Sequence, residues 1–132
     1  MSNVPVRLVG GDQYSGRLEV FYNNIWGTVC QQGFNILAAN TVCRQLGFNS
    51  GAITYYGGAH YGPGSGKVWL TNVSCSPSDN NIATCGHSYW GKTDVCTHEY
   101  DVSIDCNPGK LILSTLGIFA NPQYNFAIST FA

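Results

Sequence analysis

Hydrophobic and polar positions alternate along the first part of the chain. Between residues 16 and 22, apolar side chains occupy every second position, and this period of two is typical of a strand with one buried face. The pair Asn23-Asn24 follows, and paired asparagines favour a tight hairpin turn. The pattern therefore predicts strands at residues 6–11, 16–22 and 25–30, with the last two forming a hairpin.

The period changes in residues 36–46. Helical spacing relates the apolar residues Ile36, Ala39, Val42, Cys43 and Leu46. This spacing predicts an amphipathic helix that packs its apolar stripe on the core. Asn35 stands where an N-cap residue would accept a backbone hydrogen bond, and Gly47 stands where a helix would end.

The second half of the chain combines loops with short strand patterns. Residues 57–66 contain five glycines and one proline, which predicts an irregular loop. Further strands are predicted at residues 67–73 and 102–106. Trp26 and Trp69 are large enough to be expected in the core.

A change in composition marks the end of the domain at Asn107-Pro108-Gly109. Residues 111–132 carry no charge and have a turn-like polar middle, which interrupts any spanning helix. We expect a domain at residues 1–106 and an apolar, uncharged extension at 107–132. The extension is predicted to add a short β-like strand or hairpin, although the start of a following region or a self-association contact also fits.

The overall charge excludes one class of partner. The 132 residues carry six Lys or Arg and seven Asp or Glu, with a formal net charge of −1. Nucleic-acid binding requires clustered positive charge, and the basic residues here are scattered in the sequence. We expect no nucleic-acid partner.

Six cysteines in a chain of this length predict a disulfide framework and an extracellular location. The sequence alone allows 15 pairings. No apolar run reaches membrane-spanning length, so membrane contact is expected only through other parts of a parent protein. The start of the chain lacks a signal-peptide pattern, and we expect any leader to have been removed.

Several motifs in order resemble the scavenger receptor cysteine-rich (SRCR) family over about residues 6–106. They are GRLEV at 16–20, WGTVC at 26–30, VCRQLGF at 42–48, YGPGSG at 61–66, VWL at 68–70 and VSC at 73–75. The resemblance implies a small disulfide-rich α+β domain in which a curved antiparallel sheet cradles one α-helix. Tyr14 and Phe48 occupy the positions of a fourth bridge found in many members, so the chain is similar to the six-cysteine, group A-like type.

The familiar pairing of that family implies the bridges Cys30–Cys96, Cys43–Cys106 and Cys75–Cys85. Such bridges would tie the helix to the closing strand and hold the loops in place.

Several members of the family bind a divalent cation through two adjacent aspartates and a glutamate. The equivalent positions here are Gln31, Gln32 and Tyr100. A second family site aligns with Thr71, Ser74 and Val95, which also lack carboxylates. No cofactor is therefore required. Calcium is the remaining candidate, at Asp94, Glu99 and Asp101; the alternative is that Asp101 is a structural carboxylate and the others are solvated.

Two other sequence patterns are similar to known chemical sites but have structural explanations. His87 and His98 each follow a cysteine by two residues, a pattern with some similarity to a zinc site, but oxidised cysteines cannot be thiolate ligands. Ser65 lies between glycines as in a nucleophile elbow, yet a strand rather than a helix is predicted after it. We therefore expect no enzyme activity within this chain.

Exposed aromatic residues are the candidates for ligand binding. Tyr89, Trp90, Tyr55 and Tyr56 lie in loop-like sequence contexts, and Tyr and Trp anchor interfaces and stack on sugar rings. For Tyr89 and Trp90, a place in the core fits equally well. Asn72 begins an N-glycosylation acceptor triplet.

These patterns predict an extracellular, scavenger-receptor-type recognition module, secreted or part of a cell-surface protein. Its partner would be a protein, a glycan or a microbial surface ligand, bound on a rigid disulfide-stapled surface. The alternatives are a non-catalytic accessory domain of a larger extracellular enzyme, such as a protease or an amine oxidase, and an adhesion or assembly domain that uses residues 107–132.

Overall fold

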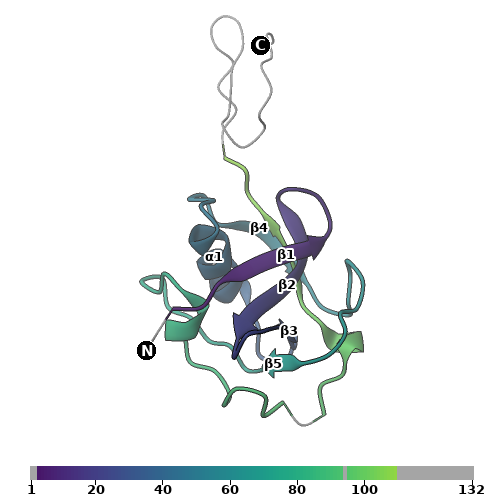
Figure 1. Ribbon diagram of the computed structural model, residues 1–132. Coiled ribbons are helices and arrows are strands. Elements are labelled where there is room, and N and C mark those ends of the chain that lie inside the picture. The colour runs from purple at the N-terminus through teal and green to yellow at the C-terminus, as the bar shows by residue number, and fades with distance from the viewer. Residues whose placement is uncertain (1–2, 94, 110–132) are drawn as a thin grey trace, which may run out of the picture.

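The structure, a computed structural model, describes residues 3–93 and 95–109. Its strands are β1 (Val6–Gly10), β2 (Ser15–Tyr22), β3 (Ile25–Val29), β4 (Ala52–Tyr56), β5 (Val68–Leu70) and β6 (Ser103–Cys106). Its helices are α1 (Ile36–Gln45) and two short 3₁₀ helices, η1 (Ile82–Thr84) and η2 (His98–Tyr100). The small α+β fold with a curved sheet and α1 on one side is confirmed (Figure 1). The extension lies, from residue 110 on, outside the described residues.

The predicted hairpin is formed by β2 and β3. The two strands pair antiparallel, with Tyr22 opposite Ile25. Asn23 and Asn24 link them with positive φ angles of 51° and 65°, which is the backbone conformation of a type I′ turn. Asparagine tolerates this conformation better than most residues do, so the local sequence sets the register of the hairpin.

The order of the sheet is β4-β6-β2-β3-β5, and β1 also pairs with β2. All strand pairs are antiparallel except β3 and β5, which run parallel. The alternation pattern did not predict β4. Tyr55 and Tyr56, expected in a loop, therefore lie on a strand that pairs with β6.

The helix begins and ends as its capping residues predict. The Asn35 side chain accepts a hydrogen bond from the Ala38 N–H at 3.1 Å, and Gly47 follows the helix with a φ of +97°. The buried face is shifted from the predicted stripe and consists of Ala38, Ala39, Thr41, Val42 and Cys43. Ile36, expected in the core, is 40% exposed because it lies in the first turn, at the edge of the packed face.

The core lies between α1 and the sheet. Its fully buried members include Leu18, Val20, Val42 and Ile104. Trp69 belongs to this core as expected. Trp26 does not: it is only half-buried, and the Arg7 guanidinium lies 4.1 Å from its ring centroid. In β3, Trp26 lies three positions before the buried Val29. Side chains alternate between the two faces of a strand, so an odd offset places Trp26 and Val29 on opposite sides of the sheet.

Three disulfides cross-link the fold, two of them between residues far apart in the sequence. They link Cys30 to Cys96, Cys43 to Cys106 and Cys75 to Cys85, which are the pairs that the family resemblance implies. The bridge from Cys43 on α1 to Cys106 on β6 fastens the helix to the sheet across 63 residues of sequence. The packing that brings them together places the helix directly over the closing strand.

Candidate functional site

The carboxylate of Asp101 is fully buried and already has its partners. It accepts a hydrogen bond from the Gly64 N–H at 2.7 Å, and its Oδ2 lies 2.9 Å from Nδ1 of His98. His98 also places Nε2 3.0 Å from the Gly66 carbonyl oxygen. Asp101 and His98 therefore hold the glycine-rich loop 57–66 against the sheet.

This geometry bears on the calcium candidates. Asp101 points into the protein, towards Gly64 and His98, whereas Glu99 is exposed on η2. Asp94 lies outside the described residues. The structure thus does not bring Asp101 and Glu99 together as a pair of free carboxylates, and a calcium site at these residues stays a prediction.

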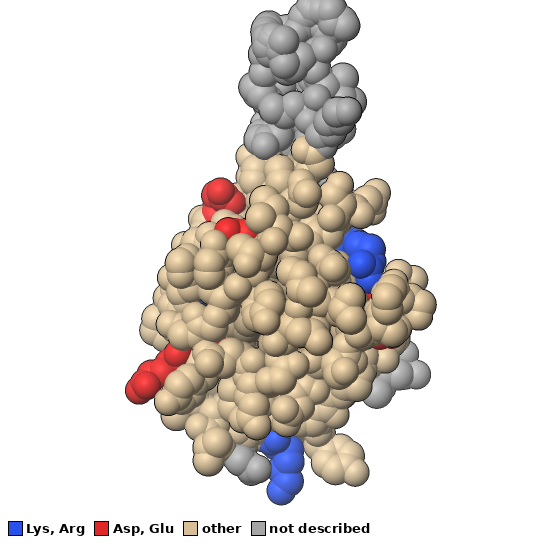
Figure 2. All heavy atoms as spheres, turned by 180° about the vertical axis from the view of Figure 1, so that it is seen from behind, with Lys and Arg blue, Asp and Glu red and all other residues tan. Residues whose placement is uncertain are grey.

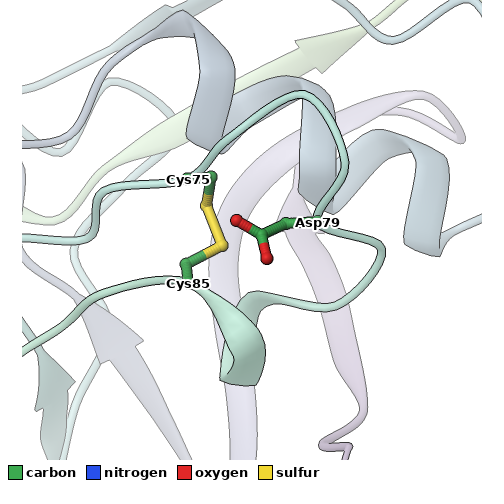
Figure 3. A group of neighbouring side chains, drawn as sticks. All are labelled: Cys75, Asp79 and Cys85. Atoms are coloured by element: carbon green, nitrogen blue, oxygen red, sulfur yellow. A yellow bond between two sulfur atoms is a disulfide. The ribbon is translucent and has the colours of Figure 1, made fainter.

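Cys75, Asp79 and Cys85 form the one cluster of three metal-ligand residue types within residues 3–93 and 95–109 (Figure 3). The two sulfurs are bonded to each other, so neither is a thiolate that could bind a metal. Asp79 accepts hydrogen bonds from the Ser76 N–H at 2.7 Å and from the Thr84 hydroxyl at 2.8 Å. These bonds hold its pKa below the usual value. The cluster is therefore a turn closed by a disulfide and by the hydrogen bonds of Asp79.

A pocket of about 440 Å³ lies over the disulfide between Cys30 and Cys96. We call it the amide pocket; it is lined by Cys30, Gln31, Gln32, Val95, Cys96 and Tyr100. Val95 is 79% exposed and Tyr100 is 42% exposed. None of these lining residues is charged, so Gln31, Gln32 and Tyr100, where the family resemblance implied carboxylates in cation-binding members, lie on a neutral surface.

The amide pocket is held rigidly by backbone hydrogen bonds. The Gln31 N–H donates to the Tyr100 carbonyl at 2.8 Å, and the Cys30 N–H donates to Leu70 at 2.8 Å. The Gln31 side chain accepts from the Gly58 N–H at 2.6 Å. From the sequence, Gln31 and Tyr100 are only positions where a cation ligand is lost. Their place beside the exposed Val95 becomes visible once the Cys30–Cys96 disulfide brings the three segments together.

The four aromatic candidates do not converge on one surface. Tyr89 is 84% exposed. Trp90 is half-buried and stacks on Tyr22 with 4.0 Å between ring centroids, so its environment combines packing with exposure. Tyr55 lies on β4, at the opposite edge of the sheet from β5, and its ring packs against that of Phe34.

Tyr56 has a structural partner. Its hydroxyl donates to Asp105 at 2.9 Å, and the Tyr61 hydroxyl donates to the same carboxylate at 2.5 Å. The hydrogen bond to Asp105 raises the pKa of each tyrosine. The Tyr56 hydroxyl therefore links β4 to β6, whereas the Tyr61 hydroxyl ties the loop 57–66 to β6.

The structure gives no geometric support to a zinc site at His87 and His98 or to a nucleophile at Ser65. Ser65 is exposed, and within the described part of the chain it makes no hydrogen bond to a histidine. His87 places Nδ1 2.6 Å from the carbonyl oxygen of Ser88, whereas His98 contacts Asp101 and Gly66. The two histidines serve separate local structures.

Charge is sparse over the surface. On the face drawn in Figure 2, the charged side chains are few and separated by wide uncharged areas. Among the described residues, the ion pairs join Arg7 and Arg17 to Glu19 and His98 to Asp101. Two of the basic residues thus already share one carboxylate.

Asn72 lies next to the amide pocket. It is exposed, with a positive φ of 55°, and its N–H donates to the Gln32 carbonyl at 2.9 Å. Glycosylation of Asn72 stays a prediction, but a glycan there would border the pocket through Gln32.

The comparison with known families identifies the domain. The sequence model of the scavenger receptor cysteine-rich domain matches residues 8–107. The chain belongs to the SRCR family. Its three disulfides fit the six-cysteine type of this family.

The similar curated proteins include several much longer ones. Lysyl oxidase homolog 2A from Danio rerio is 46% identical over 110 residues, which cover 82% of this chain and 15% of that protein. Lysyl oxidase homolog 4 from Homo sapiens is 42% identical, over 82% of this chain and 14% of that protein. The SRCR chain thus spans about one-seventh of the length of these relatives.

Two solved SRCR domains have similar structures. The third SRCR domain of murine Neurotrypsin has a TM-score of 0.71 and 36% identity, covering 78% of this chain and 95% of that one. The dimeric form of the SRCR domain of mouse MARCO has a TM-score of 0.65 and 38% identity, covering 77% and 94%. Each neighbour is a single domain of the same fold.

This SRCR domain is extracellular. Its family, its relatives and its disulfide framework agree on this location. Within residues 3–93 and 95–109, no helix has the length and apolar character to cross a membrane.

Proposed function

We propose that this SRCR domain is a non-catalytic recognition module of a larger extracellular protein, and that it binds a protein partner through the amide pocket without a bound cation. The observation that carries this proposal is an uncharged pocket over a disulfide, with an exposed valine and a half-exposed tyrosine at its rim. The relatives, of which the chain covers about one-seventh, support a parent protein with further domains.

The composition of the amide pocket supports a protein partner. The cores of protein interfaces are depleted in charge and enriched in tyrosine. Val95 and Tyr100 provide apolar area, and the side chain of Gln32 adds an amide that can pair with a peptide group. A surface for a free polyanion would need excess positive charge instead.

Rigidity supports affinity at this pocket. Its three segments are fastened by the Cys30–Cys96 disulfide and by the hydrogen bonds of Gln31. A surface that is already ordered loses little conformational entropy when a partner binds, so even a small contact area can give useful affinity.

The parent protein supported by the comparisons is an extracellular enzyme of the lysyl oxidase homolog type. In such a protein this domain would position the catalytic part rather than perform the reaction. We also propose that residues 1–106 form the folding unit. The family match to residues 8–107 supports this boundary.

The test is a printed array of extracellular matrix proteins, probed with the full chain in calcium and again in EDTA. We expect equal binding in both buffers. Val95→Asp should weaken it at least tenfold by placing a charge in the interface, whereas the neutral Val95→Thr should weaken it much less. Tyr89→Ala serves as a second control, because Tyr89 is exposed but does not line the amide pocket.

Loss of binding in EDTA would contradict a cation-independent mode. Equal binding by wild type and Val95→Asp would contradict the choice of the amide pocket.

A further inference from the structure

A second pocket lies at the end of the β2–β3 hairpin. It has a volume of about 610 Å³ and shares no lining residue with the amide pocket. We call it the aromatic pocket; its lining includes Asn3, Phe21, Tyr22, Asn23, Asn24 and Trp90. Its volume falls in the range of sites for small ligands, roughly 300–1,000 Å³.

The aromatic side of this pocket is fixed in place. Trp90 and Tyr22 stack in parallel, with 4.0 Å between ring centroids and 4° between ring planes. Tyr22 also contacts Trp69 in a T-shaped arrangement, and the Trp69 Nε1 donates to the Ile25 carbonyl at 2.9 Å. The Gly91 N–H donates to the Trp69 carbonyl at 2.8 Å, which holds the chain beside Trp90. The rings therefore form a preformed apolar wall.

The polar side of the pocket consists of groups without partners in the fold. Within residues 3–93 and 95–109, the side-chain amides of Asn3, Asn23 and Asn24 make no hydrogen bond, and neither do the Tyr22 hydroxyl and the Trp90 indole N–H. Each amide offers two donors and one acceptor oxygen. Five hydrogen-bonding groups thus surround an aromatic wall, and none of the pocket's lining residues is charged.

The hairpin turn explains why the amides are grouped. Asn23 and Asn24 both have left-handed backbone conformations, and the turn projects two consecutive side chains beside the end of β2. The N-terminal segment is held next to them because the Phe21 N–H donates to the Pro5 carbonyl at 3.0 Å. This places Asn3 at the same pocket. Glycine would serve the turn equally well, so the turn itself does not require these amides.

We propose that the aromatic pocket is a binding site for neutral carbohydrate. A sugar ring has an apolar face of C–H groups that packs on an aromatic ring, and hydroxyls at its edge that pair with amides. The absence of charge among the lining residues disfavours sulfated or sialylated sugars. This inference rests on the proposed function only for its extracellular setting, and it adds a second, independent surface.

A proline-rich peptide is the rival occupant, because such peptides dock on aromatic grooves. Those grooves present spaced rings between which a proline can insert. Here the rings of Tyr22 and Trp90 are in direct contact, so no slot exists between them. The three amides at the hairpin and N-terminal segment also match a ligand rich in hydroxyls better than an apolar proline.

The test uses an array of neutral oligosaccharides of glucose, galactose, mannose and N-acetylglucosamine, with sulfated and sialylated glycans and a proline-rich peptide alongside. The full chain should bind a subset of the neutral sugars. The double variant Asn23→Gly, Asn24→Gly keeps the left-handed turn but removes two amides, and it should weaken binding at least tenfold. Trp90→Ala should weaken it similarly.

The matched controls are Tyr89→Ala and Val95→Asp, which lie outside the aromatic pocket and should bind sugar as wild type does. The proposal is overturned if no neutral sugar binds, if only charged glycans or the peptide bind, or if the double glycine variant binds sugar normally. Weakening of sugar binding by Val95→Asp would place the sugar in the amide pocket and overturn this inference, while the protein array tests the proposed function separately.

Discussion

His98 and Asp101 form an ion pair in which the carboxylate is fully buried and the imidazole is partly exposed. Nδ1 of His98 lies 2.9 Å from the Asp101 carboxylate, and Nε2 lies 3.0 Å from the Gly66 carbonyl oxygen. Both partners are acceptors, so only the doubly protonated imidazolium can donate to both. The pair is therefore a charged clamp on the glycine-rich loop.

The charge of His98 makes stability depend on pH. Burial lowers the pKa of His98, but the hydrogen bonds to Gly66 and Asp101 raise it by more, so this pKa lies above its ordinary value of 6.5. A group whose pKa is raised by folding stabilises the protein fully below its unfolded pKa. We expect the melting temperature to fall as pH rises above about 6.5 and through the folded pKa of His98.

The measurement is thermal unfolding by circular dichroism between pH 5 and 9. His98→Gln should lower the melting temperature at the acid end and flatten its decline above neutral pH. His87→Gln is the control, since His87 has no carboxylate partner among the described residues. A decline that persists unchanged in His98→Gln would refute the assignment.

The three disulfides should differ in their contribution to stability. In the loop-entropy relation, closing 63 residues between Cys43 and Cys106 stabilises by about 4.3 kcal/mol, and closing 10 residues between Cys75 and Cys85 by about 2.7 kcal/mol. Urea unfolding of the two double-alanine variants measures the difference. Both pairs are buried, so the loss of side-chain packing is similar, and a smaller loss for Cys43 and Cys106 would count against the relation here.

Gly27 is required by the packing of Trp69. A Cβ at Gly27 would overlap Cδ1 of the Trp69 ring and would lie 2.8 Å from its Nε1. The ring is fixed by its hydrogen bond to Ile25, so Gly27→Ala should destabilise the domain by about 1–3 kcal/mol. Gly86→Ala is the matched control, because its Cβ would meet no atom closer than 3.6 Å. Equal urea midpoints for the two variants would contradict this account.

Calcium should not stabilise the domain. The buried Asp101 carboxylate is engaged by Gly64 and His98, whereas calcium requires six to eight oxygen ligands. A site with a Kd of about 10 µM would add about 2.7 kcal/mol at 1 mM calcium. We expect instead the same melting temperature in 1 mM calcium and in EDTA; an increase of several degrees would restore Asp94, Glu99 and Asp101 as candidate ligands.

Whether the extension mediates self-association can be tested by measuring the mass of the protein in solution. Chains ending at residue 109 retain the hydrogen bond from the Asn107 N–H to the Gly51 carbonyl at 2.8 Å. Light scattering of the full and shortened chains should show self-association only in the full chain if residues 110–132 mediate assembly. Identical masses would remove that role and leave the domain boundary intact.

Local sequence determined the elements whose signals are short-range. The Asn23-Asn24 turn, the Asn35 cap and the alternation in residues 16–22 each depend on neighbouring residues, so the hairpin and the helix could be predicted. The family resemblance implied the disulfide pairs, which spacing alone left open. β4 escaped prediction because it has an irregular pairing with β6 and half-buried side chains on both faces.

Only the tertiary structure decided which residues share a surface. From the sequence, Asp101 is a possible calcium ligand, whereas Gln31 and Tyr100 are positions where a ligand is lost. A sequence does not show which way a carboxylate points or which segments a disulfide brings together. Folding buries Asp101 under Gly64 and unites Gln31 with Tyr100 over Cys30–Cys96. It likewise brings Trp90 onto Tyr22, 68 positions away in the sequence. Contacts over such distances follow from the packing of the whole core, and local sequence patterns carry no record of them.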